Sequence, residues 1–157
     1  MGWGNLATLL PIVLALLLLS SGIEDARLRT IANWKNATIA LLAVPWWIVN
    51  GMALWPDIAM QLGVALMIFA FFCAAFHFGQ MGGGDVKLIG ALALWFPIQP
   101  LMWLLIVMSL VGGVVTIAMV IDRWRRRDGS PVEVPYGVAI AIAGLIAVRE
   151  PLFNQIA

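Results

Sequence analysis

The sequence is poor in charged residues. Asp, Glu, Lys and Arg together make up 11% of its 157 residues, and the formal net charge is +1. Soluble proteins carry about a quarter of their residues as charges. Binding to nucleic acid depends on an excess of Lys and Arg that neutralises phosphates, and no such excess is present. We therefore expect no nucleic-acid partner.

Cysteine and histidine are almost missing. Cys73 is the only cysteine, which excludes an internal disulfide and any zinc site built from several cysteines. His77 is the only histidine, so the residues that usually hold a catalytic transition metal are not available as a cluster. The sequence predicts no metal and no other cofactor.

What the sequence has in abundance is apolar residues. They make up 63% of the chain, and the mean hydropathy is +1.01. A soluble helix alternates apolar and charged faces, whereas the stretch 101–121 contains no charge at all. These features predict an all-α fold, a polytopic bundle of membrane helices, formed as a single domain over residues 1–157.

Six apolar segments are long enough, or nearly long enough, to span a bilayer, which takes about 20 residues. Residues 1–5 lack the positive charges of a secretory signal, so we expect the first segment to stay as a membrane helix. The fourth segment is short. Several tryptophans lie near the segment ends, where we expect them to anchor in the membrane interface: Trp46, Trp47, Trp55, Trp95 and Trp103. The six segments are Leu6 to Gly22, Ala37 to Leu54, Ile58 to Phe78, Val86 to Phe96, Leu101 to Ile121 and Val134 to Val148.

The basic residues predict the orientation of the spans. If the segments alternate in direction, eight of the nine basic residues fall on one side and only Arg149 on the other. Lys and Arg collect in short cytoplasmic loops. The N-terminus should therefore face outward and three loops inward. The inward residues are Arg27, Arg29, Lys35, Lys87, Arg123, Arg125, Arg126 and Arg127.

Two of these inward loops each hold an aspartate at a membrane boundary. Asp25 follows the first segment, and Asp85 precedes the fourth. Ionisable groups at membrane depth are costly and are usually functional. Two carboxyl groups that share a proton can hydrolyse a peptide bond, because one activates water while the other protonates the leaving amide nitrogen. The pair is therefore a candidate for proteolysis.

The glycines before Asp85 favour the same interpretation. Without side chains, Gly82 to Gly84 can adopt conformations closed to other residues and admit an extended substrate. On the residues alone an equally good alternative exists, in which Asp25 pairs with Arg29 and Asp85 only caps a helix. We interpret Glu24 as a solvated charge at the boundary and Asp57 as a turn residue on the opposite side.

The second loop resembles the GxGD motif of the type IV prepilin peptidases. The matching residues read Gly82-x-Gly84-Asp85-x-Lys87-Leu88. In the first loop, a segment similar to the family's D-x-R-x-R-x-I-P-N matches everywhere except at Ala32, where proline is usual. A third stretch, residues 134–137, resembles the family's P-[YF]-G helix start. The matches of the first loop are Asp25, Arg27, Arg29, Ile31 and Asn33.

The resemblance implies a specific activity. It makes Asp25 and Asp85 the catalytic carboxylates and places the substrate against Gly82, Gly83, Gly84 and Lys87. The implied substrate is a prepilin, with a basic leader ending in glycine and a hydrophobic helix in the membrane. The protein would lie among the lipids of the inner (plasma) membrane, and cleavage would occur at the cytoplasmic face.

The sequence also looks like a small, peptidase-only branch of the family. It lacks the N-terminal domain with paired cysteines that larger bifunctional members carry, so a companion methyltransferase activity is not implied. This form is associated with tight-adherence (Flp) pili. Two other functions stay open: a noncatalytic membrane component for assembly or transport, and a GxGD protease of another substrate such as an archaeal preflagellin.

The predicted topology can be tested by labelling. Single cysteines introduced at Arg126 and at Asp57, in a chain whose Cys73 has been replaced, should react with an impermeant thiol reagent from opposite sides of the membrane. Labelling of both positions from the same side would contradict the alternating arrangement.

Overall fold

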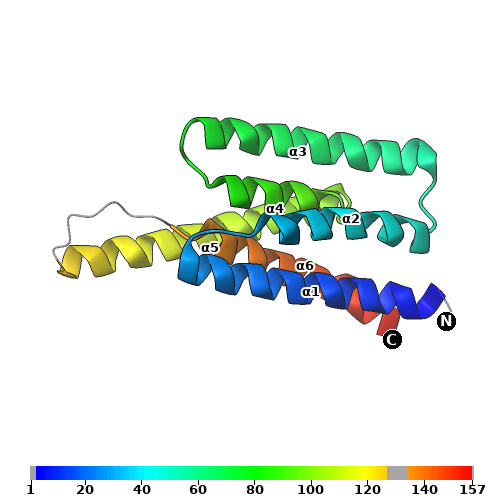
Figure 1. Cartoon of the computed structure of the whole chain (residues 1–157), viewed down its shortest axis with the longest axis horizontal. Coiled ribbons are helices and arrows are strands. Elements are labelled where there is room, and N and C mark those ends of the chain that lie inside the picture. Colours follow the sequence, from blue (N-terminus) through cyan, green and yellow to red (C-terminus); the bar gives the residue numbers. More distant parts are fainter. Residues whose placement is uncertain (1–2, 127–133, 157) are drawn as a thin grey trace.

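The chain folds into a bundle of helices (Figure 1). The computed structural model describes residues 3–126 and 134–156, with side-chain surroundings for residues 5–125 and 134–149. A short π-helical turn, η1, precedes the third α-helix. The elements are α1 (Trp3–Leu28), α2 (Asn33–Val49), η1 (Leu54–Ile58), α3 (Ala59–His77), α4 (Gly83–Ala93), α5 (Ile98–Arg126) and α6 (Tyr136–Ile156).

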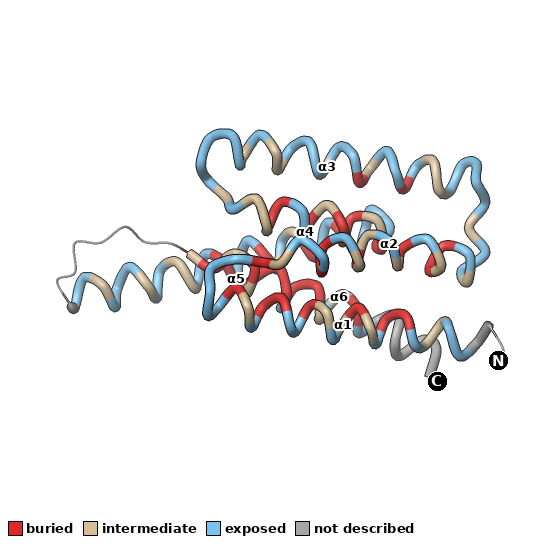
Figure 2. Tube along the Cα trace, in the orientation of Figure 1, coloured by how far each residue is buried: buried red, intermediate tan, exposed pale blue. Residues whose placement is uncertain are grey.

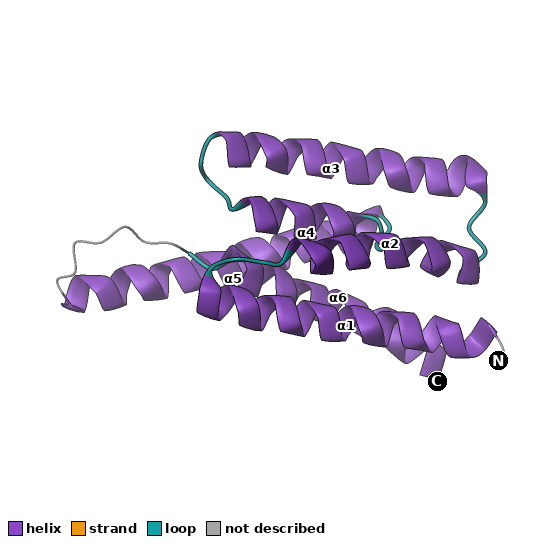
Figure 3. Cartoon of the chain, in the orientation of Figure 1, coloured by secondary structure: helices purple, strands orange, loops and turns teal. Residues whose placement is uncertain are grey.

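Successive helices alternate in direction. The loops that end α1 and α3 lie at the same end of the bundle, as does the start of α6 (Figure 3). The connection after α2 lies at the opposite end, near the start of α1, and the connection after α4 lies toward that end but further inside the bundle. The two aspartate loops are thus at one end, as predicted. Arg127, the last basic residue expected after the fifth segment, lies outside the described residues.

The predicted segments correspond to the six α-helices, with shifted ends. The largest shifts are at the C-terminal ends of α1 and α6, and the shifts that bear on the site are at the starts of α2 and α4, which begin at Asn33 and Gly83 instead of Ala37 and Val86. Both helices start within the polar motifs, because a helix begins where its first N–H groups can be satisfied and not where hydropathy rises. The extra turns bring the motif residues onto helix termini.

The tightest contact in the bundle is between α1 and α6. Leu10, Leu14, Leu18 and Asp25 form one buried stripe along α1. Small residues of α6 face this stripe. A Cβ atom added to Gly22 would lie 2.8 Å from the Cβ of Ala141, and one added to Gly144 would lie 2.8 Å from Leu18. Small residues let membrane helices approach closely, and here they allow α6 to run directly against α1.

The shortest helix, α4, lies in the centre of the bundle and contacts α2, α3 and α6. Its 11 residues span about 16 Å, half of a bilayer's hydrocarbon thickness. Its terminal carbonyls therefore need partners inside the protein. Gln61 donates to the carbonyls of Ala93 and Phe96, both at 2.7 Å, and the Trp47 indole donates to that of Leu94 at 2.8 Å.

The tryptophan prediction is only partly correct. Trp46, Trp47 and Trp95 are buried, and the Trp95 indole donates to the Ile39 carbonyl at 2.8 Å. Trp55 and Trp103 are exposed, as interfacial anchors would be. Proximity to a segment end thus did not distinguish tryptophans that pack inside the bundle from those that face the surroundings.

The outer surface of the bundle is apolar. Figure 2 shows buried residues gathered where α1, α2, α4 and α6 meet, while most of α3 is exposed. Large hydrophobic side chains such as Leu66, Met67 and Phe71 are exposed on α3. Surfaces of this kind mark contact with lipid or protein. Within the part of the chain that the structure describes, three helical stretches have the length and composition of membrane spans: Asn5–Leu28, Leu54–His77 and Ile98–Arg125.

The close approach of α1 and α6 predicts a stability effect. Gly22→Val should destabilise the protein by about 1–3 kcal/mol, because the new side chain must push α6 away. Gly63→Val is the matched control, since nothing lies within 4 Å of a Cβ atom at that position. Thermal unfolding in detergent should separate the two variants. Equal melting temperatures would show that the α1–α6 contact does not limit stability.

Candidate active site

Asp25 lies in the last turn of α1 and is 4% exposed. Its Oδ2 atom accepts a hydrogen bond of 3.2 Å from the Val138 N–H, and the Gly137 N–H also bonds to the carboxyl group. These donors belong to the first turn of α6, whose free N–H groups and dipole favour a negative charge. A Cβ atom on residue 137 would lie 2.7 Å from Cγ of Asp25, so glycine is needed there.

Asp85 lies in the first turn of α4 and is 7% exposed. Burial, together with the negative charge of Asp25, raises the pKa of the Asp85 carboxyl to about 7, and a hydrogen bond from the Gly82 N–H opposes this rise. Packing brings the two carboxyl groups to the same place: Gly84, the neighbour of Asp85, and Gly137, which contacts Asp25, both pack against Ile31. Close carboxyl groups titrate as a coupled pair.

The glycines before Asp85 serve a different purpose from the one predicted. Gly82 has φ −72° and ψ 145°, and Gly83 and Gly84 begin α4. None of the three has a positive φ, so the expectation of a conformation closed to other residues is wrong. What they allow is close approach. A Cβ atom on Gly84 would lie 3.3 Å from the Cβ of Ile31, and one on Gly82 would lie 3.0 Å from Oδ2 of Asp85.

The capping alternative describes part of the geometry. The Asp85 carboxyl group does accept a hydrogen bond from the N–H of Gly82, the residue before its helix. Arg29 is exposed, and its N–H bonds to the Asp25 carbonyl at 3.0 Å. Capping does not explain why a second carboxyl group is buried beside the first, since like charges in a low dielectric repel. Such an arrangement is typical of catalytic pairs.

Two hydrogen bonds connect the aspartate motifs directly. The Asn36 side chain donates to the Gly84 carbonyl at 3.1 Å, and Lys87 Nζ donates to Asn33 Oδ1 at 2.8 Å. Both bonds join the start of α2 to the start of α4. Asn36 is buried and was not predicted from the sequence, because a polar residue in the first turn of an apolar segment gives no indication of its partner.

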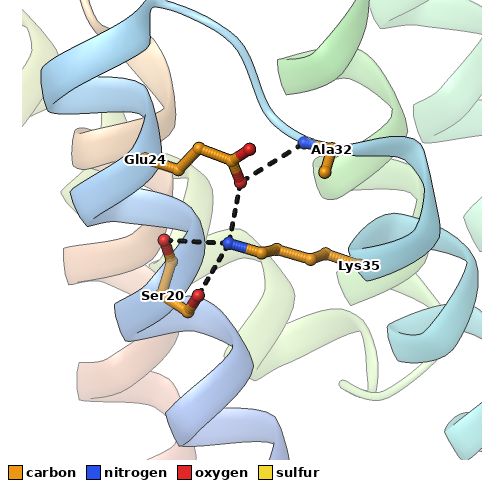
Figure 4. Close-up of polar contacts among 4 residues, drawn as sticks. All are labelled: Ser20, Glu24, Ala32 and Lys35. Atoms are coloured by element: carbon orange, nitrogen blue, oxygen red, sulfur yellow. Dashed lines mark hydrogen bonds and ion pairs between the residues drawn. The ribbon is translucent and has the colours of Figure 1, made fainter.

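The interpretation of Glu24 as a solvated charge is wrong. Its Oε2 atom forms an ion pair of 2.7 Å with Lys35 Nζ, and the Glu24 side chain is 22% exposed. Lys35 also donates to the hydroxyl of Ser20 at 2.6 Å (Figure 4). The pair links α1 to α2 one residue away from Asp25. Asp57, in contrast, lies at the other end of the bundle, where its side chain accepts from the Ala53 N–H as a turn residue does.

An open groove of about 500 Å³ begins at these motifs. Polar residues from the starts of α2 and α4 line one part of it, and apolar residues of α2, α3 and α4 line the rest. Small side chains on α2 and α4 give the groove its depth. The lining residues are Asn33, Asn36, Ala37, Ala40, Leu62, Ala65, Leu66, Phe69, Lys87, Gly90, Ala91 and Leu94.

Among the residues whose placement is described, no three His, Cys, Asp or Glu side chains gather as metal ligands would. The absence of a catalytic metal stays a prediction. The chemistry that this arrangement can perform with its own groups is proton transfer between two carboxyl groups and a water molecule.

The raised pKa of Asp85 predicts a pH-dependent stability. The folded pKa of about 7 exceeds the ordinary 3.8, so the folded state binds more protons than the unfolded state between these values. The resulting stabilisation is complete below about pH 4 and is lost as the pH rises to about 7. Asp85→Asn should melt above the wild type at about pH 8 and close to it at about pH 4. A lower melting temperature at about pH 8 would show instead that ionised Asp85 stabilises the fold.

Comparisons with known proteins place this arrangement in a family. Over 68 residues the chain is 40% identical to the prepilin leader peptidase/N-methyltransferases of Aeromonas salmonicida and Aeromonas hydrophila. The alignment covers 43% of this chain and 22% of each relative. No solved structure matches. The family model of the type IV leader peptidases matches residues 12–117, a stretch that includes both aspartate motifs, and the chain belongs to that family.

Proposed function

We propose that this protein is an aspartic endopeptidase that removes the leader of type IV prepilin-like substrates. The observation that carries the proposal is the pair of buried carboxyl groups, Asp25 and Asp85, which come from separate motifs and meet at one end of the bundle. Family membership supports a peptidase, and the names of the relatives in Aeromonas support prepilin as the substrate.

The pair can carry out peptide hydrolysis while holding a single proton. One carboxylate removes a proton from a water molecule, and the water oxygen attacks the scissile carbonyl carbon. The other carboxyl group, still protonated, first donates a hydrogen bond to the carbonyl oxygen. Collapse of the tetrahedral intermediate breaks the C–N bond, and a proton passes to the leaving nitrogen. A pKa of about 7 for Asp85 suits a proton donor at neutral pH.

The groove supplies a place for the substrate. Its apolar walls on α2, α3 and α4 suit the hydrophobic helix of a prepilin, which would lie along the groove within the membrane. Lys87 and Asn33, at the polar part of the groove, would contact the chain near the cut, with Gly82, Gly83 and Gly84 beside it. Because α4 is short, Asp85 at its start would lie deeper in the membrane than the end of a full-length span. That depth would put it near the end of a substrate helix.

The proposed location follows from the charges. The end that holds both aspartates also holds Arg27, Arg29, Lys35 and Lys87, which favours the cytoplasmic side of the inner membrane. We propose Flp-type prepilins as the substrate class, on the sequence resemblance to the peptidase-only branch. A preflagellin-like substrate would use the same geometry.

The central prediction concerns Asp25→Asn and Asp85→Asn. Each substitution preserves the size of the side chain but removes the proton exchange that hydrolysis needs, so each should slow leader removal by at least about 10²- to 10⁴-fold. The double variant should be scarcely worse than the poorer single variant, because the two groups act as one unit. Coexpression with a Flp-type prepilin, followed by a mobility-shift assay, measures processing.

Asp57→Asn is the matched control, because Asp57 is an aspartate in η1, which belongs to the connection between α2 and α3 at the opposite end of the bundle. It should process the substrate at the wild-type rate. Membrane insertion and abundance should be alike in all variants. Full processing by both Asp25→Asn and Asp85→Asn would rule out the proposed function and leave a noncatalytic role in assembly or transport.

A further inference from the structure

A buried cation, Lys35, is paired with Glu24, the residue before Asp25, and has no part in the hydrolysis described above. The Lys35 side chain is 9% exposed, and its ammonium group contacts three acceptors: Glu24 Oε2 at 2.7 Å, Ser20 Oγ at 2.6 Å and the Ser20 carbonyl at 3.2 Å. Figure 4 shows Lys35 reaching from the start of α2 to the last turns of α1. An ammonium group has three N–H donors, and each has an acceptor here.

Glu24 extends this contact to the loop between the two helices. Its Oε2 atom also accepts a hydrogen bond of 3.4 Å from the Ala32 N–H. Ala32 precedes α2 and gives the helix no side-chain cap. The Glu24 carboxylate therefore lies at the N-terminus of α2, where a negative charge is stabilising. The ends of α1 and α2 are joined through one charged group.

The loop held in this way touches both halves of the active site. Ile31 is buried, and a Cβ atom on Gly84 would lie 3.4 Å from the Ile31 nitrogen. A Cβ atom on Gly137 would lie 2.8 Å from Cδ1 of Ile31. Ile31 thus packs between the helix start that carries Asp85 and the helix start that binds Asp25.

We propose that Lys35 is a positioning residue. Through Glu24 it holds Ile31 between Gly84 and Gly137, and it balances the negative charge that Glu24 carries next to Asp25. This inference rests on the proposed function. The Lys35 ammonium group bonds to Glu24 and Ser20 and not to the carboxyl pair, so its effect is exerted through the loop and through the charge that it balances.

The backbone of Ala32 allows the two effects to be separated. Ala32 has φ −61° and ψ 131°, values that a proline ring adopts without strain. Ala32→Pro would stiffen the loop and would also remove the N–H that donates a hydrogen bond to Glu24. This variant therefore tests the conformation of the loop separately, because it changes no charge.

Variants of Lys35 and of Glu24 should shift the pH–activity profile in opposite directions, because they remove opposite charges. Lys35→Met leaves the Glu24 carboxylate unpaired beside Asp25, and the added negative charge favours protonated carboxyl groups, so the pH–activity profile should move to higher pH. Glu24→Gln leaves the Lys35 ammonium unpaired, so the profile should move to lower pH. Each shift should be about 0.5–1 pH unit, the order of magnitude for one charge added or removed near a carboxyl group that solvent partly screens.

Other charged and titratable groups near this end stay the same in every variant. Arg29 follows α1 and acts on Asp25, and Lys87 of α4 is bonded to Asn33. Tyr136 begins α6, and His77 ends α3. Since none of these is altered, opposite shifts in the two variants would come from the Glu24–Lys35 pair.

The experiment measures kcat, KM and the pH–activity profile of the purified full chain in detergent, with a purified Flp-type prepilin as substrate. Lys35→Met should lower kcat about tenfold with little change in KM, the pattern of a positioning defect. Adding Ala32→Pro should restore part of kcat but leave the profile displaced. Adding Glu24→Gln should return the profile toward that of the wild type, and Lys35→Arg should not displace it.

Several results would overturn the inference. Profiles of Lys35→Met and Glu24→Gln that move in the same direction, or that do not move, would mean that the pair only supports the fold. If Lys35→Met fails to accumulate, Glu24→Gln must still shift the profile to lower pH and Lys35→Arg must not. Activity of Asp25→Asn and Asp85→Asn in the same assay would refute the proposed function itself, whereas loss of their activity with an unaffected Lys35→Met would refute only the role of Lys35.

Discussion

The contact between α1 and the start of α6 is the constraint on which the rest of the structure depends. A carboxylate can be buried in an apolar bundle only where hydrogen-bond donors replace its water. The backbone N–H groups of Gly137 and Val138 supply them to Asp25. This requires the two helices to touch at a residue without a side chain, and the same closeness continues along the interface to Gly144.

The short α4 solves a related problem for Asp85. A helix that ends inside the bundle leaves carbonyls without partners, and Gln61 and Trp47 bond to them. With its far end satisfied, α4 can begin at the depth where Asp85 meets Asp25. Polar side chains distant from the carboxyl groups thus set how deeply one of them lies.

Much of this could be predicted from the sequence. The apolar runs identified the six helices, and alternation of the spans put Asp25 and Asp85 at one end. The predicted starts of α2 and α4 were misplaced, because hydropathy does not report where a helix finds its first hydrogen-bond partners. The pairing of Glu24 with Lys35 was missed for another reason: the two residues are close along the chain but lie on different helices, and their contact depends on how the loop between them folds.

The arrangement of α3 has a consequence for the membranes in which this protein can work. This helix packs mainly on α4 and leaves most of its surface to the surroundings. A bilayer thicker or thinner than the bundle is accommodated by tilting of its helices, and α3 is free to tilt without displacing the contact of α1 with α6. Changes in lipid composition would then alter the wall of the groove and, through the hydrogen bonds of Gln61 to the end of α4, the position of Asp85, while Asp25 stays in the contact of α1 with α6.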